Sequence, residues 1–169
     1  METLLSHRPA TDEDIVSICP FAETKESLFF FFPNAVFPVT PKQLQINVKS
    51  RFHATTILSN GNVVGFGNLF NHPESGLCYI GNLIIDPEKR GQGIGRYLAQ
   101  TLISLGFEDP AVESMHLCCF NENIRGLKLY HSLGFKPFSM EFLNHPDGRP
   151  AAMIHFSLPR NEFMLKREG

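Results

Sequence analysis

Alternating apolar and polar positions divide the middle of the chain into strands joined by tight turns. Residues 52–59 and 62–70 are rich in Thr, Ile, Val and Phe, which favour pleated, half-buried strands. Asn60-Gly61 between them is typical of a two-residue hairpin loop, since both loop positions need a positive φ. We expect a further strand from Leu77 to Asp86, with a bulge at Gly81-Asn82, where the apolar alternation is interrupted.

Two helix starts and one unusual apolar run lie in the first fifty residues. Thr11 is a suitable N-cap, with Asp14 at the third helical position and acidic residues in the first turn. A second helix is predicted from Thr40 to near Ser50. The run Phe29–Phe32, with Phe37 after it, has two interpretations: a core-facing helix turn and loop, or an apolar wall over an acceptor pocket.

The second half of the chain contains two amphipathic helices separated by a strand of buried residue types. Leucines repeat on one face of the first helix, and Gly106 is expected to cap its C-terminal end. The second helix, Ile124–Leu133, is expected to close at Gly134. Strands are predicted at Ser114–Phe120, Phe135–Phe142 and Ala151–Leu158, followed by a polar tail. His116 lies in the first of these strands and is interpreted as a core residue.

These elements predict a mixed α+β domain that spans residues 1–169. Its sheet is expected to have about six to seven strands, to be mostly antiparallel, and to be flanked by helices. The order strand, helix, strand in residues 77–120 requires one parallel pair with a right-handed crossover. A length of 169 residues suits one domain with a single sizeable core.

Composition and charge exclude several functional classes. Fifteen Lys and Arg residues against seventeen Asp and Glu residues argue against a nucleic-acid partner. No apolar run is long enough to cross a bilayer and no signal-peptide pattern is present, so we expect a cytoplasmic protein without a membrane partner. The spacing of Cys19, Cys78, Cys118 and Cys119 fits neither a zinc site nor a disulfide framework. We therefore expect reduced, mostly buried thiols and no metal.

A glycine-rich loop at Arg90–Arg96 joins the strand at residues 77–86 to the first amphipathic helix. The unpaired N–H groups and positive end of a helix attract phosphate, and glycines let the backbone approach a ligand closely. Three kinds of phosphate loop are candidates at this position. The Rossmann pattern G-x-G-x-x-G fails because Arg96 stands at the third glycine position, and the Walker A pattern is absent.

The remaining pattern, R-x-x-G-x-G at Arg90–Gly95, resembles the first signature of the GNAT superfamily of N-acetyltransferases. Asn123 and Tyr130, seven residues apart, are similar to the second signature of that family, as is the Leu-Gly-Phe sequence at residues 133–135. The two motifs occur in the family's order and at a matching separation.

The resemblance implies an acetyl-CoA-dependent N-acetyltransferase with a V-splayed sheet and no metal. The residues that it implies for coenzyme A binding are Leu83, Ile84, Ile85, Arg90, Gly91, Gln92, Gly93, Ile94, Gly95, Arg96, Asn123 and Tyr130. The loop would hold the pyrophosphate, the strand before it the pantetheine arm and thioester, and Asn123 the side of the pantetheine. Tyr130 is expected to act in catalysis by stabilising the thiolate leaving group.

Amine acetylation also needs a base, and no residue stands out for this role. The strand before the loop contains no acid until Asp86, which begins a turn and is interpreted as structural. Glu74 is the catalytic candidate, and His72 is a second; both lie just before this strand and could act directly or through water. Asn82 could position a water but accepts no proton at neutral pH.

The expected acceptor is a primary amine of a small molecule, which attacks the thioester directly in a ternary complex. No acetyl-cysteine is expected, because no cysteine stands in an evident base-activated setting. A protein or peptide amine is an alternative acceptor, and a non-catalytic acyl-CoA-binding sensor is an alternative function. The charge balance argues against a toxin-like enzyme that acts on aminoacyl-tRNA. The resemblance also leaves a homodimer open.

Overall fold

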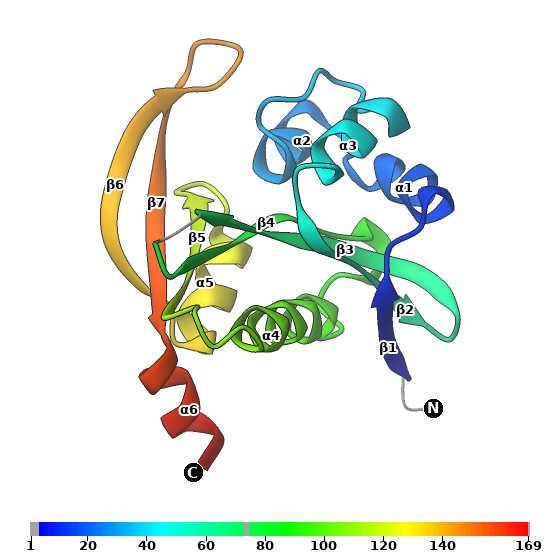
Figure 1. Cartoon of the computed structure of the whole chain (residues 1–169). Helices are drawn as coiled ribbons and strands as arrows, with labels where there is room; N and C mark the ends of the chain where they lie inside the picture. Colours follow the sequence, from blue (N-terminus) through cyan, green and yellow to red (C-terminus); the bar gives the residue numbers. More distant parts are fainter. Residues whose placement is uncertain (1–3, 73–74, 169) are drawn as a thin grey trace. The chain divides into compact units, whose positions relative to one another are not determined.

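The computed structural model describes residues 4–72 and 75–168 of the chain (Figure 1). Its strands are β1 (Leu5–Pro9), β2 (Phe52–Ser59), β3 (Asn62–His72), β4 (Leu77–Ile85), β5 (Ser114–Phe120), β6 (Lys136–Asn144) and β7 (Pro150–Pro159). Its helices are α1 (Asp12–Ile18), α2 (Lys25–Phe31), α3 (Pro41–Val48), α4 (Ile94–Phe107), α5 (Ile124–Leu133) and α6 (Arg160–Glu168), with short 3₁₀ turns η1 (Cys19–Phe21) and η2 (Pro87–Lys89).

The strands form one seven-stranded mixed sheet in the order β1-β2-β3-β4-β5-β7-β6. Antiparallel pairs join β1 to β2, β2 to β3, β5 to β7 and β7 to β6, whereas β4 and β5 are parallel. The helix-flanked mixed sheet expected from the sequence is therefore confirmed. The parallel connection runs through α4, as the order of elements requires.

Contacts within the chain divide it into two compact units. Unit 1 contains Met1–Phe70 and Ile80–Leu105, and unit 2 contains Asn71–Tyr79 and Gly106–Gly169. Strands β3 and β4 and helix α4 contribute residues to both units.

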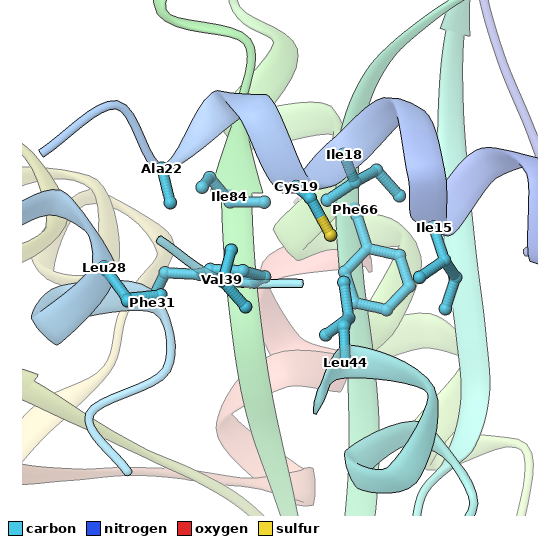
Figure 2. Packing of buried hydrophobic residues seen from close by; sticks show 10 residues of the cluster. All are labelled: Ile15, Ile18, Cys19, Ala22, Leu28, Phe31, Val39, Leu44, Phe66 and Ile84. Carbon is cyan, nitrogen blue, oxygen red and sulfur yellow. The ribbon is translucent and has the colours of Figure 1, made fainter. Parts of the chain in front are cut away.

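Unit 1 has helices on both faces of its strands: α1, α2 and α3 cover one face and α4 covers the other (Figure 1). Phe66 on β3 and Ile84 on β4 share a buried cluster with side chains of the first three helices (Figure 2). On the opposite face, a Cβ atom at Gly67 would lie 2.7 Å from Leu102 Cδ1, so the glycine allows α4 to approach the strand.

The phenylalanine run forms part of the core of unit 1. Phe31 belongs to the same buried cluster as Leu28, and Phe29 is also buried (Figure 2). The core-facing interpretation is therefore confirmed for these residues. Phe37, by contrast, lines a surface hollow of about 430 Å³ between α1, η1 and the start of α3.

Helix α1 begins with a capping box that has further polar partners. The Thr11 N–H donates to Asp14 Oδ2 over 2.8 Å, and the Asp14 N–H donates to Thr11 Oγ1 over 3.3 Å. The Asp14 carboxylate also accepts hydrogen bonds from Arg8 Nη2 at 3.0 Å and Thr56 Oγ1 at 3.1 Å. The predicted N-cap at Thr11 is confirmed, and its partners tie β1 and β2 to the helix.

Several turns follow the sequence expectations. Asn60 and Gly61 have φ values of 50° and 84°, and Gly134 closes α5 with a φ of 98°. Asn82 has a φ of 48°, which marks an irregular backbone at the predicted bulge. Strand β3 extends to His72, so the expected end at Phe70 was too early.

Unit 2 corrects two further expectations. Gly106 lies inside α4 rather than capping it, and a Cβ at this position would overlap the Met115 side chain of β5, which accounts for the glycine. The polar tail forms a helix, α6, which Arg160 anchors by donating to the carbonyls of Phe107, Asp109 and Val112. Both features depend on partners that are distant in sequence. None of the described helices has the length and apolarity needed to span a membrane.

Candidate functional site

The glycine-rich loop of unit 1 leads directly into α4. Gly91 and Gly93 have φ values of 78° and 82°, and a Cβ at either position would meet no other atom within 4 Å. The Tyr97 N–H donates to the Gly93 carbonyl over 3.0 Å, so the N–H groups of Ile94 and Gly95 precede the first turn of helical hydrogen bonds. The loop therefore combines a backbone free of side chains with the positive end of a helix, which suits a phosphate group.

Residues on either side of this loop differ in what they offer to a ligand. Asp86 Oδ1 accepts from the Glu88 N–H over 3.0 Å, which agrees with its interpretation as a turn residue. The Ile84 side chain packs in the core of unit 1, so only its backbone is available to a ligand (Figure 2). Arg90 and Arg96 both have exposed side chains beside the loop.

A short chain of amide groups crosses β3, β4 and α2 in unit 1. Asn82 Nδ2 donates to the Phe31 carbonyl over 3.1 Å, and Asn68 Nδ2 donates to Asn82 Oδ1 over the same distance. Because a carbonyl can only accept, this order of donors leaves Asn68 Oδ1 as the free end of the chain. Asn68 is fully buried, and this oxygen has no hydrogen-bond partner among the described residues. No local pattern in the sequence singled out Asn68.

Helix α5 of unit 2 holds the two residues of the second motif. Asn123 is its N-cap, and Asn123 Oδ1 accepts from the Gly126 N–H over 3.0 Å. Tyr130 is buried, with its ring 6.1 Å from that of Phe135. Burial and the nearby Cys119 raise the pKa of the Tyr130 hydroxyl, so it keeps its proton and can donate a hydrogen bond.

A second group of polar side chains lies on one face of the β5–β7–β6 sheet in unit 2. Cys118 Sγ lies 3.2 Å from His155 Nδ1, and His155 Nε2 lies 3.5 Å from Glu141 Oε2. All four cysteines are free; Cys19, Cys78 and Cys119 are buried, as expected for most of them, whereas Cys118 is exposed. Partial desolvation of the thiol by the groups around it and the charge of Glu141 raise the pKa of Cys118 to about 11.

His116 is buried as predicted, at 9% exposure, but its Nδ1 atom has no hydrogen-bond partner among the described residues. The sequence indicated only a core position, since the partners around the ring come from other strands. Glu74 lies outside the described residues, so its catalytic role stays a prediction. Within the described part of the chain, no group of three or more His, Cys, Asp or Glu side chains could hold a metal ion.

The structure thus places the loop and the β4 residues in unit 1, and Asn123 with Tyr130 in unit 2. A strand, glycine loop and helix in a mixed sheet, followed by an Asn-to-Tyr helix, are the features of a coenzyme A-dependent acyltransferase. The model of the Acetyltransferase (GNAT) family matches residues 21–135, and the chain belongs to this family. It is therefore an acetyl-CoA-dependent N-acetyltransferase.

Individual relatives act on different acceptors. The [ribosomal protein bS18]-alanine N-acetyltransferase of Escherichia coli K12 is 28% identical over 120 residues, which are 70% of this chain and 79% of that protein. The crystal structure of spermidine N-acetyltransferase from Vibrio cholerae, in complex with CoA and spermine, has a TM-score of 0.78 at 17% identity, covering 95% of this chain and 98% of that one. Aminoglycoside acetyltransferase AAC(6')-Ib, in complex with coenzyme A, has a TM-score of 0.74 at 19% identity, covering 97% and 99%. At these identities the two structures show a shared fold.

Proposed function

We propose that the protein transfers the acetyl group of acetyl-CoA to a primary amine of a small molecule, by direct attack in a ternary complex. One catalytic domain would span both units. The observation that carries this proposal is the loop at the start of α4, where Gly91 and Gly93 leave the backbone open to a pyrophosphate.

The proposed contacts to acetyl-CoA use mostly backbone groups. N–H groups from Gly91 to Arg96 would hold the pyrophosphate, with the guanidinium groups of Arg90 and Arg96 adding charge-assisted hydrogen bonds. The backbone of Leu83–Ile85 would hold the pantetheine and thioester. In Asn123 the oxygen already accepts from the helix, so its Nδ2 would be the group that donates to the pantetheine.

Tyr130 is proposed to donate to the sulfur as the thioester bond breaks. A buried hydroxyl with a raised pKa suits this role, since it is a donor at every pH at which the enzyme would work. The pKa of Cys118, raised to about 11, supports direct attack rather than an acetyl-cysteine intermediate, because little thiolate exists near neutral pH.

A second acceptor class is the α-amine at the N-terminus of a protein. One observation favours it: the relative at 28% identity acts on the alanine of ribosomal protein bS18. Both acceptor classes present a primary amine, and they differ in what surrounds it.

The test is release of CoA thiol from acetyl-CoA with a panel of acceptors: a polyamine, an aminoglycoside, free amino acids, and a peptide that begins with alanine. Turnover with a small amine, confirmed by a mass increase of one acetyl group, supports the proposal. Turnover with the peptide alone would replace it with the second class. Acetyl-CoA raising the melting temperature without any turnover would favour a sensor that binds acyl-CoA.

A further inference from the structure

Four aromatic side chains meet on one face of the sheet in unit 2. Side chains alternate along β5, so Met115, Leu117 and Cys119 lie on the face opposite to that of His116 and Cys118. The His116 ring centre lies 5.2 Å from that of Tyr79 on β4 and 5.3 Å from that of Phe138 on β6. Phe138 in turn lies 6.1 Å from His155 on β7. Four strands therefore contribute to one cluster, which we call the histidine face.

The two imidazoles of the histidine face differ in whether their ring nitrogens have polar partners. Both ring nitrogens of His155 are engaged, Nδ1 by Cys118 and Nε2 by Glu141. His116, in contrast, is packed between rings and keeps Nδ1 without a partner among the described residues. An unpaired buried polar atom destabilises the fold, so such an atom indicates a ligand or an ordered water that completes it.

The charge around His116 favours a neutral ring. Burial lowers the pKa of His116 below its usual value of 6.5, and the nearby His155 lowers it further by a smaller amount. The titratable groups on the surrounding strands are Tyr79, Cys118, Glu141 and His155. Burial raises the pKa of the Tyr79 hydroxyl, and burial and Glu141 raise that of the Cys118 thiol, so neither adds a negative charge near neutral pH. In the Nε2–H tautomer, Nδ1 then presents a lone pair.

The position of His116 along the strands also points to a ligand. The parallel pairing of β4 and β5 runs from Leu77 with Ser114 to Tyr79 with His116, so these two residues form its final pair. In open α/β sheets, ligands bind beyond the carboxyl ends of parallel strands, and we apply the same rule to this parallel pair. His116 lies at that end.

We propose that His116 is the general base of the acetyl transfer and takes the proton of the attacking amine at Nδ1. This inference rests on the proposed function and names the base that the sequence left open. As the amine nitrogen attacks the thioester, the carbon–nitrogen bond forms and the carbon–sulfur bond breaks, with its electron pair leaving on the CoA sulfur. His116 receives the proton that the nitrogen loses, and the Tyr130 hydroxyl gives a proton to the sulfur. The proton on His116 then returns to Tyr130 through solvent, so the products are the N-acetyl amine and CoA thiol.

Two substitutions at His116 separate proton transfer from packing. His116→Gln removes the base, and His116→Phe removes it while keeping a ring between Tyr79 and Phe138. His131→Gln is the matched control, because His131 is exposed on α5. With the amine that the wild type acetylates, both His116 variants should lose turnover by roughly 100-fold at pH 7, the usual contribution of a general base. The increase in melting temperature with acetyl-CoA should remain.

The pH profile provides a readout that a structural role would not change. Turnover of the wild type should fall below pH 6.5, as His116 becomes protonated, and this acidic limb should be absent in His116→Gln. Turnover of His116→Phe within threefold of the wild type, or an unchanged acidic limb in His116→Gln, would overturn the proposal.

Failure of the proposed function would give a different result. If no amine is acetylated by the wild type, the slow hydrolysis of acetyl-CoA, with water as the acceptor, becomes the readout. A lower hydrolysis rate in both His116 variants but not in His131→Gln would still support the base. An equal rate in all of them would overturn it.

Discussion

Asp14 in unit 1 and His116 in unit 2 are both buried polar side chains, but their hydrogen-bonding groups are satisfied to different degrees. Asp14 in unit 1 is 4% exposed and accepts hydrogen bonds from Arg8, Thr11 and Thr56. His116 in unit 2 is 9% exposed, and its Nδ1 has no partner among the described residues. A buried polar group whose hydrogen bonds are all made stabilises the fold, whereas one with an unpaired atom can still form a hydrogen bond with a ligand.

The two units also differ in the kind of group that each is proposed to contribute to the reaction. The candidate binding groups of unit 1 are backbone N–H groups of a glycine loop, and its buried carboxylate is structural. The candidate reactive groups of unit 2 are side chains, Tyr130 on α5 and His116 on β5. We therefore expect substitutions in the glycine loop or at Asp14 to change acetyl-CoA affinity or stability, and substitutions of Tyr130 or His116 to change turnover.

The largest effect is expected from Gly93→Asp in unit 1. The carboxylate would repel the pyrophosphate where the structure offers only backbone, so the affinity for acetyl-CoA should fall roughly 1,000-fold. The matched control is Gly148→Asp, because Gly148 has a similar φ of 86° and equally open surroundings. Calorimetric titration with acetyl-CoA tests this. Equal affinities of the two variants for acetyl-CoA would show that the loop does not form part of the binding site.

Tyr130→Phe in unit 2 should lower turnover roughly 100-fold, since a donor to the leaving sulfur is lost. The affinity for acetyl-CoA should change less than threefold. Tyr97→Phe is the control, because the Tyr97 hydroxyl is hydrogen-bonded to His7 Nδ1 at 2.9 Å within unit 1. Steady-state kinetics separate the two effects. A variant whose affinity and turnover fall together would place Tyr130 in binding rather than in the chemical step.

Asp14→Asn should reduce stability without changing turnover. Burial alone would raise the pKa of Asp14, but hydrogen bonds from Arg8, Thr11 and Thr56 outweigh it and lower the pKa from 3.8 to about 2. A carboxyl whose folded pKa is depressed stabilises the protein above its unfolded pKa, and this contribution is lost as the pH falls from 3.8 through about 2. The shift corresponds to about 2 kcal/mol.

Urea unfolding of Asp14→Asn and of the wild type measures this contribution. The difference in unfolding free energy should be full at pH 6 and should shrink as the pH approaches 2. Glu13→Gln changes an exposed acid of the same helix turn and serves as the control. A difference that stays constant with pH would mean that the Asp14 charge is not what stabilises α1.

The smallest effect is expected from Cys118→Ser, which should leave turnover within about twofold, since a thiol with a pKa of about 11 is a poor nucleophile near neutral pH. In the native protein, iodoacetamide should modify Cys118 before the three buried cysteines, at a rate that rises with pH up to about 11. Mass spectrometry of the intact protein measures the modification by iodoacetamide and would also detect an acetyl adduct. A large loss of turnover, with an acetyl adduct on Cys118 of the wild type, would indicate a covalent intermediate instead.

The elements that could be predicted from the sequence are those whose causes lie within a few residues. The Thr11 cap, the Asn60-Gly61 hairpin and the glycine loop at Gly91 and Gly93 depend on local dihedral angles and local hydrogen bonds. The two family motifs are also short, so the class of enzyme and its co-substrate followed from them.

The features that only the tertiary structure decided depend on contacts between distant segments. Gly106 was expected to be a cap but lies within α4, where the close packing of Met115 of β5 leaves no room for a side chain. Arg160 anchors a helix that its own polar sequence did not indicate. The histidine face is the clearest case: His116 resembles any core histidine in the sequence. Its rings and its unpaired Nδ1 appear only when four strands meet, since sheet pairing, and not local propensity, sets which side chains share a face.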